Sequence, residues 1–170
     1  MIQMQMSLGE VLRLTLFGTS HGPSVGAFLE GVPAGISIDY HKLETLMSKR
    51  RPGGRYASKR REPDKVEFLS GIDNGVTNGG KIEISIKNKD VRTKDYSFLP
   101  DHPRPGHQDM VMMKRTDGEA DLRGGGMSSA RLTAPIVAAS AIITPLIERL
   151  EININAHVCS IGIIDSKPLS

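Results

Sequence analysis

The chain is predicted to be an α+β protein in which an antiparallel sheet packs on a long buried helix. Residues 11–17 and 81–87 alternate between apolar and polar side chains, which is the period of a strand with one buried face. The run from Ser129 to Leu150 is apolar on most sides and predicts a helix inside the core. The 170 residues show no internal repeat or linker, so one α+β domain over residues 1–170 is expected.

The first half of this pattern begins with two strands and a helix. Val11 to Phe17 ends in a glycine-bounded turn, and Val25 to Val32 returns from that turn as a second strand. Asp39 is placed to cap a helix that runs to about Arg50, where Pro52-Gly53-Gly54 stops it.

The second half is less regular. Residues 49–65 are dense in Lys and Arg and predict an exposed loop, while residues 89–105 are irregular and marked by proline. Further elements are expected as strands at Val66–Leu69, Lys81–Lys87 and Ile152–Ile164, and as a short helix at Gln108–Lys114. Pro145 predicts a kink or an early end of the main helix.

Composition limits the function classes. The net charge of +3 is too small by itself to indicate nucleic acid. A lone cysteine, Cys159, excludes an internal disulfide and fits a reducing compartment. No basic-then-apolar leader opens the chain, and the apolar run Ala134–Ile147 is short for a bilayer span. A cytoplasmic protein without a membrane partner is expected.

The segment from Leu122 to Arg131 is the most informative one. Its three consecutive glycines allow tight turns, and Ser128 and Ser129 follow where a helix would begin. Backbone N–H groups, hydroxyls and flanking guanidiniums of Arg123 and Arg131 would converge there on an anion such as phosphate. A tight loop that only starts a buried helix is the alternative interpretation.

Two histidines lie in glycine-bounded turns. His21 follows the first strand, and His107 lies in Arg104-Pro-Gly-His107. An imidazole can give or take a proton near neutral pH, and nearby arginines favour its neutral form. His41, His102 and His157 are interpreted as structural or solvated. A Ser20 nucleophile beside His21 is disfavoured because adjacent side chains seldom point at each other.

The basic loop admits three interpretations. Arg50, Arg51 and Arg55 bracket a Pro-Gly-Gly turn that could fold over a carboxylate or phosphate. A solvated charge run is the plain alternative, and RNA binding through Lys59–Arg61 is the third. Only one aromatic residue, Tyr56, lies there, so base stacking is unsupported. Histidine, cysteine and aspartate spacings show no metal site.

Taken together, the motifs resemble the chorismate synthase family. They occur in order along the chain: Gly18-Thr-Ser-His-Gly22, Gly31-Val-Pro-Ala-Gly35, Lys49-Arg-Arg-Pro-Gly53, Arg61-Glu-Pro-Asp-Lys65, Arg104-Pro-Gly-His107 and Arg123-Gly-Gly-Gly-Met-Ser-Ser-Ala-Arg131. The resemblance extends from about Leu8 onward.

The resemblance implies a lyase of the shikimate pathway of aromatic amino acid biosynthesis. This family removes phosphate from 5-enolpyruvylshikimate 3-phosphate by anti 1,4-elimination to give chorismate, and it needs reduced FMN. His21 and His107 would be the acids. Met127, Ser128 and Ser129 would contact FMN, and Arg50 and Arg55 would bind NADPH or substrate anions. Ser20, Arg104 and Arg131 are further substrate-binding candidates.

The chain also departs from the family. Thr19 stands where an acidic residue is usual, Met127 where many members have Arg, and Leu132 where Glu is frequent. Family members are roughly twice as long, so the chain would form one half of their β-α-β sandwich, which is built as a homotetramer. A non-catalytic derivative that binds anions therefore stays open as an alternative.

Overall fold

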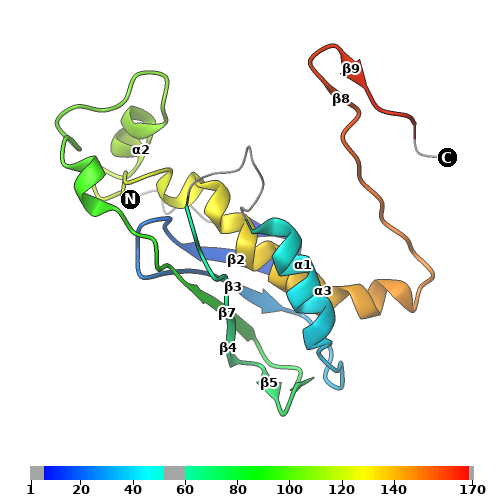
Figure 1. The fold of residues 1–170 in the computed structure, drawn as a ribbon. Coiled ribbons are helices and arrows are strands. Elements are labelled where there is room, and N and C mark those ends of the chain that lie inside the picture. The colour runs from blue at the N-terminus through cyan, green and yellow to red at the C-terminus, as the bar shows by residue number, and fades with distance from the viewer. Residues whose placement is uncertain (1–5, 52–59, 169–170) are drawn as a thin grey trace.

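The computed structural model describes residues 6–51 and 60–168, and within them one antiparallel sheet organises the fold (Figure 1). Its strand order is β1-β2-β3-β7-β4. These strands are β1 (Ser7–Leu8), β2 (Arg13–Gly18), β3 (Ser24–Glu30), β7 (Ile82–Lys87) and β4 (Val66–Ser70). Two small hairpins pair β5 (Ile72–Asp73) with β6 (Val76–Thr77) and β8 (Ser160–Ile161) with β9 (Ile164–Asp165).

Two of the three α-helices cover one face of the sheet. The α-helices are α1 (Tyr40–Arg50), α2 (Asp109–Arg115) and α3 (Thr133–Glu148), and 3-10 turns lie at Thr93–Tyr96, Gly126–Ser128 and Ala130–Leu132. α3 packs against β3 and β7, and α1 packs against α3 (Figure 1). The predicted α+β fold, a sheet packed on a long helix, is confirmed.

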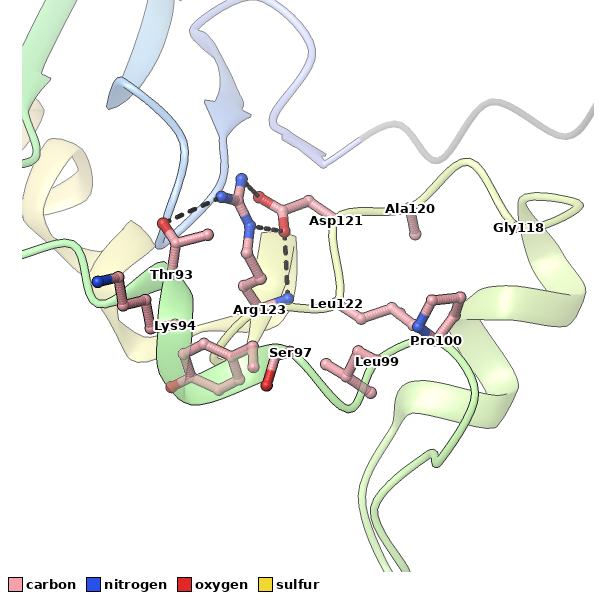
Figure 2. A pocket seen from close by; sticks show the side chains of 11 residues that line it. Thr93, Lys94, Ser97, Leu99, Pro100, Gly118, Ala120, Asp121, Leu122 and Arg123 are labelled. Atoms are coloured by element: carbon pink, nitrogen blue, oxygen red, sulfur yellow. Dashed lines mark hydrogen bonds and ion pairs between the residues drawn. The ribbon is translucent and has the colours of Figure 1, made fainter.

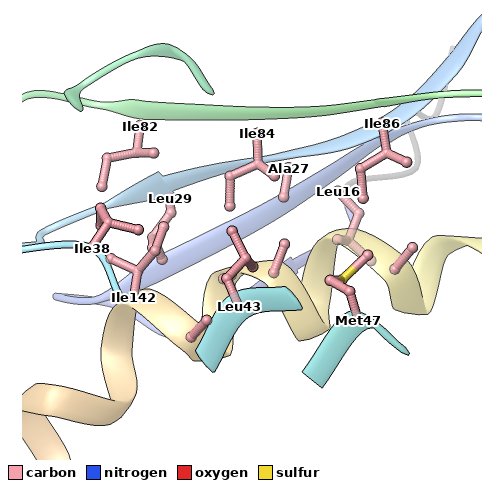
Figure 3. Packing of buried hydrophobic residues seen from close by; sticks show 14 of the residues in the cluster. Leu16, Ala27, Leu29, Ile38, Leu43, Met47, Ile82, Ile84, Ile86 and Ile142 are labelled. Atoms are coloured by element: carbon pink, nitrogen blue, oxygen red, sulfur yellow. The ribbon is translucent and has the colours of Figure 1, made fainter. Parts of the chain in front are cut away.

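The core lies between this sheet face and the two helices (Figure 3). Ile82, Ile84 and Ile86 alternate inward from β7 and are fully buried, as their period predicts. Opposite them α3 presents small side chains, including Ala134 and Ala138, which let the helix axis approach the sheet closely.

Several elements match their predictions. The strands at β2, β3, β4 and β7 and the short helix α2 lie within a few residues of the expected bounds. The cap of α1 is also as expected, because the Lys42 backbone N–H donates to Asp39 Oδ1 at 2.9 Å. This bond satisfies one of the free N–H groups at the helix start.

Other predictions were wrong. Residues 152–159 form no strand. As far as the structure describes the chain, to residue 168, the small β8–β9 hairpin follows them; its residues are exposed and it extends away from the body (Figure 1). α3 begins at Thr133 rather than Ser129, because two 3-10 turns precede it. Of the two outcomes predicted for Pro145, the early end does not occur, since α3 continues to Glu148; the kink stays a prediction.

The expectation that the apolar run is short for a bilayer span also needs correction. Counted from Ala130 to Glu148 it has 19 residues and a mean hydropathy of 1.6, which is enough, by length and composition only, to cross a membrane. Its packing against β3, β7 and α1 accounts for the same apolar composition, as in the core helix of a globular domain.

Candidate active site

A turn at the end of β2 carries the first predicted histidine. Gly18 leaves the strand with a φ of +86°, and a Cβ there would lie 2.2 Å from the Ser24 carbonyl oxygen. The Asn88 side-chain amide donates to the carbonyls of Thr19 and Gly22, at 3.0 and 2.8 Å. The turn is therefore fixed at both ends.

Within this turn Ser20 and His21 do contact each other, so the expectation that adjacent side chains would not meet was wrong. Ser20 Oγ lies 3.0 Å from His21 Nδ1 and donates to the Arg123 carbonyl oxygen at 3.1 Å. Because the hydroxyl proton is used on Arg123, Oγ can accept from Nδ1–H. We assign that tautomer from the bonding pattern, and it leaves Nε2 able to accept a proton.

The glycine-rich segment passes directly against this histidine. Gly124 has a φ of +62°, and a Cβ on it would lie 2.6 Å from His21 Cε1 and 2.8 Å from Ser20 Oγ. The Ser20 backbone N–H also donates to the Gly126 carbonyl at 3.1 Å. Glycine is required here because its backbone lies directly against His21 and Ser20. The sequence predicted only that this glycine allows a tight turn.

The second predicted histidine, His107, lies just before α2 and contacts its first residue, Asp109. Its Nδ1 is 2.7 Å from Asp109 Oδ1, and the Asp109 side chain is 1% exposed. The Arg104 guanidinium holds the same carboxylate with bonds of 2.8 and 2.7 Å, and these bonds keep the pKa of Asp109 well below its usual range. An ionised carboxylate therefore orients the His107 ring.

Arg104 connects the two histidines through the glycine-rich segment. Its Nη2 donates to the carbonyls of Leu122 and Gly124, at 2.7 and 2.8 Å, and Gln108 Nε2 donates to the Gly125 carbonyl at 2.6 Å. Arg104 was predicted to bind substrate, and in the structure its Nε and Nη2 contact protein groups. It holds the backbone that contacts His21.

Two adjacent cavities receive many of the predicted site residues. The first, of about 370 Å³, is lined by Ser20, His21, Arg60, Asp90, Arg92, Asp95, Tyr96, Gly124 and Ser129. The second, of about 350 Å³, is lined by Arg50, Arg60, Glu62, Ser129, Ala130, Arg131 and Thr133. Arg60 and Ser129 belong to both walls. His107, Arg104, Met127 and Ser128 line neither cavity.

A third and larger hollow, of about 520 Å³, lies beyond Arg123 (Figure 2). Arg123 and Asp121 form a two-bonded ion pair in its wall, with Nε–Oδ1 at 2.8 Å and Nη2–Oδ2 at 2.9 Å. Thr19 Oγ1 donates to Asp121 Oδ2 at 2.7 Å. The threonine that departs from the family pattern thus supports a carboxylate near His21.

Sequence reasoning missed a buried ion-pair cluster. Asp64 and Glu62 are buried, and Asp64 binds both Arg50, at 2.5 Å, and Arg131. The Arg131 side chain is 4% exposed and also donates to Asn88 Oδ1 at 2.9 Å. Residues 60–65 are a loop, as predicted, but only part of it is exposed: Arg61, Pro63 and Lys65 face solvent, whereas Glu62 and Asp64 are buried. Two acidic residues in a basic run were the available signal.

The electrostatics of His21 match the sequence expectation. Burial comes first in lowering its pKa below 6.5, and the charges of Arg60 and Arg123 lower it further, against the opposing effect of Asp121. At neutral pH the ring is accordingly held in its neutral form.

The remaining predicted residues are placed as follows. Met127 is half-buried, Ser128 is exposed and Ser129 Oγ accepts from the Arg131 backbone N–H at 3.2 Å. Ser128 ends one 3-10 turn and Ser129 lies between that turn and the next, so both serines come before α3 rather than at its first turn. Arg55 lies outside the described residues. Among the residues that the structure describes, no group of His, Cys, Asp or Glu could hold a metal.

The fold and the site define an α+β protein in which His21 and a set of arginines line cavities suited to an anionic ligand, while a second oriented histidine, His107, lies outside these cavities. The family model for chorismate synthase matches residues 12–169. The chain therefore belongs to the chorismate synthase family.

Known proteins agree with this assignment. The chain is 47% identical to the chorismate synthase of Aeropyrum pernix over 95% of its own length and 42% of that protein. For the Campylobacter fetus chorismate synthase the identity is 45%, over 96% and 46%. A crystal structure of chorismate synthase superposes with a TM-score of 0.55 at 25% identity, covering 82% of this chain and 35% of that one. The chain spans less than half the length of these relatives.

Proposed function

We propose that this chain forms part of the active site of a chorismate synthase, a lyase of aromatic amino acid biosynthesis. The reaction is the anti 1,4-elimination of phosphate from 5-enolpyruvylshikimate 3-phosphate. The C–O bond to phosphate breaks and phosphate leaves with its electron pair. A C–H bond breaks, its proton passes to a basic group in the site, and its electron pair forms the second ring double bond. The observation that carries the proposal is the family match over residues 12–169.

The geometry supports distinct tasks for the two histidines. His21 lines the first cavity with Nε2 available, so it can hold or deliver a proton at a ligand there. His107 is oriented by the Asp109 carboxylate, which fixes the ring in one position from which it could transfer a proton. Proton transfer by such positioned groups is worth roughly 10²–10⁴-fold in rate.

The second cavity suits the anionic parts of the substrate, which carries two carboxylates and a phosphate. Arg50 lines it with 17% of its side chain exposed, and Ser129 supplies a hydroxyl to both cavities. We place Ser20 and Ser129 as direct contacts. Arg104 and Arg131 act instead by holding the glycine-rich segment and the Asp64 cluster.

The chemistry of residues 127–129 fits FMN. Met127 offers a half-buried thioether for a ring face, while the hydroxyls of Ser128 and Ser129 suit its polar groups. When bound, reduced FMN supplies the electron chemistry of the reaction. Arg50 and Arg55 would bind NADPH in a protein that reduces its own flavin. A homotetramer in the cytoplasm, with this chain as one α+β domain, completes the proposal.

The test combines binding and chemistry. The chain is titrated with FMN by fluorescence, with and without the shikimate ester, and phosphate and chorismate are then measured with reduced FMN under nitrogen. The proposal expects saturable FMN binding that the ester tightens, and phosphate and chorismate in equal amounts. A folded chain that neither binds FMN saturably nor releases phosphate would contradict it.

A further inference from the structure

Arg60 occupies a junction that the motifs do not explain. It lies in the basic run, yet its side chain is 21% exposed and lines both cavities. Its Nη2 donates to the Ser20 carbonyl at 2.8 Å, and its Nε donates to Glu62 Oε1 at 2.9 Å. One guanidinium thus links the turn that carries His21 to the buried acidic cluster.

The Glu62 end of this link is itself fixed. The Glu62 side chain is 2% exposed, and its carboxylate accepts backbone N–H bonds from Lys89 at 2.8 Å and Asp90 at 3.2 Å. Surface ion pairs contribute little because both side chains must be ordered for each contact. Here two backbone N–H groups already hold the Glu62 carboxylate, so the position of the Arg60 guanidinium that binds it is fixed in advance.

We propose that Arg60 is a positioning residue for the proposed elimination: it fixes the Ser20–His21 turn and relays the charge of a bound anion to His21. The inference rests on the proposed function for its role in turnover. A lysine could not replace this guanidinium, because its ammonium is a point charge that cannot reproduce the two fixed hydrogen bonds to Glu62 and to the Ser20 carbonyl.

The charges that face His21 explain how an anion bound beside Arg60 would change the pKa of His21. Arg60 and Arg123 disfavour a protonated ring, Asp121 favours it, and Tyr96 packs edge-on at 4.8 Å between ring centroids. Asp90, Arg92 and Asp95 complete the charged wall of the cavity. Of the facing charges, Arg60 contributes most to lowering the His21 pKa. An anion beside Arg60 offsets that charge, so the pKa of His21 rises when the anion is bound.

The test follows the His21 ring by NMR titration of the 170-residue chain, with the signal assigned by its loss in His21→Gln. In wild type, sulfate raises the His21 midpoint relative to chloride at equal ionic strength. In Arg60→Met the midpoint without sulfate is already higher, and sulfate moves it less. Arg92→Met is the matched control, since Arg92 lines the same cavity but its partner is Asp90, at 3.2 Å, and its titration curve should follow wild type.

Arg60→Lys separates charge from position. It retains the positive charge, so the midpoint stays close to that of wild type, while misplacement of the turn lowers kcat roughly 100-fold with little change in KM. Thermal unfolding of each variant checks that it is folded.

Each result counts for or against the proposal. A His21 midpoint that Arg60→Met leaves unchanged, or that Arg92→Met moves equally, would overturn it, as would unchanged turnover in Arg60→Lys. Since the titrations need no turnover, a chain that never releases phosphate removes the proposed function and leaves the electrostatic link to be judged by NMR alone.

Discussion

The two turns that carry His21 and His107 hold their imidazole rings with different partners. His21 is half-buried, contacts a neutral hydroxyl and faces two arginines whose charge lowers its pKa. His107 contacts an ionised carboxylate, Asp109, which Arg104 holds in place. Both turns bear on the segment around Gly124, one by van der Waals contact and the other through Arg104.

The difference shows how one backbone segment can support two rings that are oriented by different partners. The guanidiniums near His21 favour the neutral form of its ring. The Asp109 carboxylate instead fixes the orientation of the His107 ring. The predictions below test this contrast.

The largest effect is expected from His107→Ala. Removing an oriented acid should lower turnover of the proposed elimination by about 10²–10⁴-fold, while FMN affinity stays near that of wild type. Steady-state phosphate release and flavin titration measure the two effects. His102→Ala is the control, because His102 is an exposed loop histidine. A His107→Ala protein with most of its rate would exclude this residue from the mechanism.

Asp109→Ala should chiefly reduce stability. The carboxylate is buried and accepts bonds from His107 and Arg104, so its loss leaves a largely buried guanidinium without its partner. Breaking such a pair costs about 3–5 kcal/mol. Urea unfolding measures the change, and Asp101→Ala, at an exposed position, should stay within about 0.5 kcal/mol of wild type. If Asp101→Ala lowered the free energy of unfolding as much as Asp109→Ala, the role assigned to the buried Asp109 carboxylate would be wrong.

Arg50→Ala is expected to weaken substrate binding more than it slows turnover. Arg50 lines the second cavity, and a charge-assisted hydrogen bond is worth about 1.5–3 kcal/mol, which is roughly a 10- to 150-fold rise in KM. The exposed Arg13 provides the control substitution. An unchanged KM would remove Arg50 from the anion site.

The smallest effect concerns pH. The folded-state pKa of His21 lies below 6.5, so the unfolded chain binds the proton more readily. The stability contributed by the neutral ring is therefore complete above pH 6.5 and is lost as the pH falls toward the folded pKa. Asp109 and Asp121, whose pKa values are lowered, lose their contribution only in more acidic solution.

Unfolding measured at pH 7 and pH 5.5 checks this sign. Wild type should lose more stability across the interval than His21→Gln, because that variant has no ring to protonate. An identical loss in both proteins would mean that His21 is not held neutral by its surroundings.

The sheet and the first helix could be predicted because local signals coincide with tertiary burial there. The alternation of Ile82, Ile84 and Ile86 matches the buried face of β7, and Asp39 caps α1 as its residue type suggests. The same reasoning failed for residues 152–164, where alternation is present but the described structure gives these residues no partner strand in the main sheet. Alternation of apolar and polar residues alone therefore does not establish a strand of the main sheet.

The site was predictable as a set of residues but not as a network. Both histidines and the glycine-rich segment were identified, whereas the burial of Glu62 and Asp64 was not, because a basic run gives no local sign that its acids turn inward. The contact between Ser20 and His21 was missed for a related reason. It depends on the Gly124 segment, which is about 100 residues away in sequence.

The central claim is that both turns belong to one ligand site, and the five histidine rings of the chain offer the most direct measurement. Their NMR signals are followed while reduced FMN and the shikimate ester are added. The account predicts that His21 and His107 shift together with one saturation point, while the exposed His41, His102 and His157 do not. A response of only one of the two, or an equal response of the exposed rings, would contradict it.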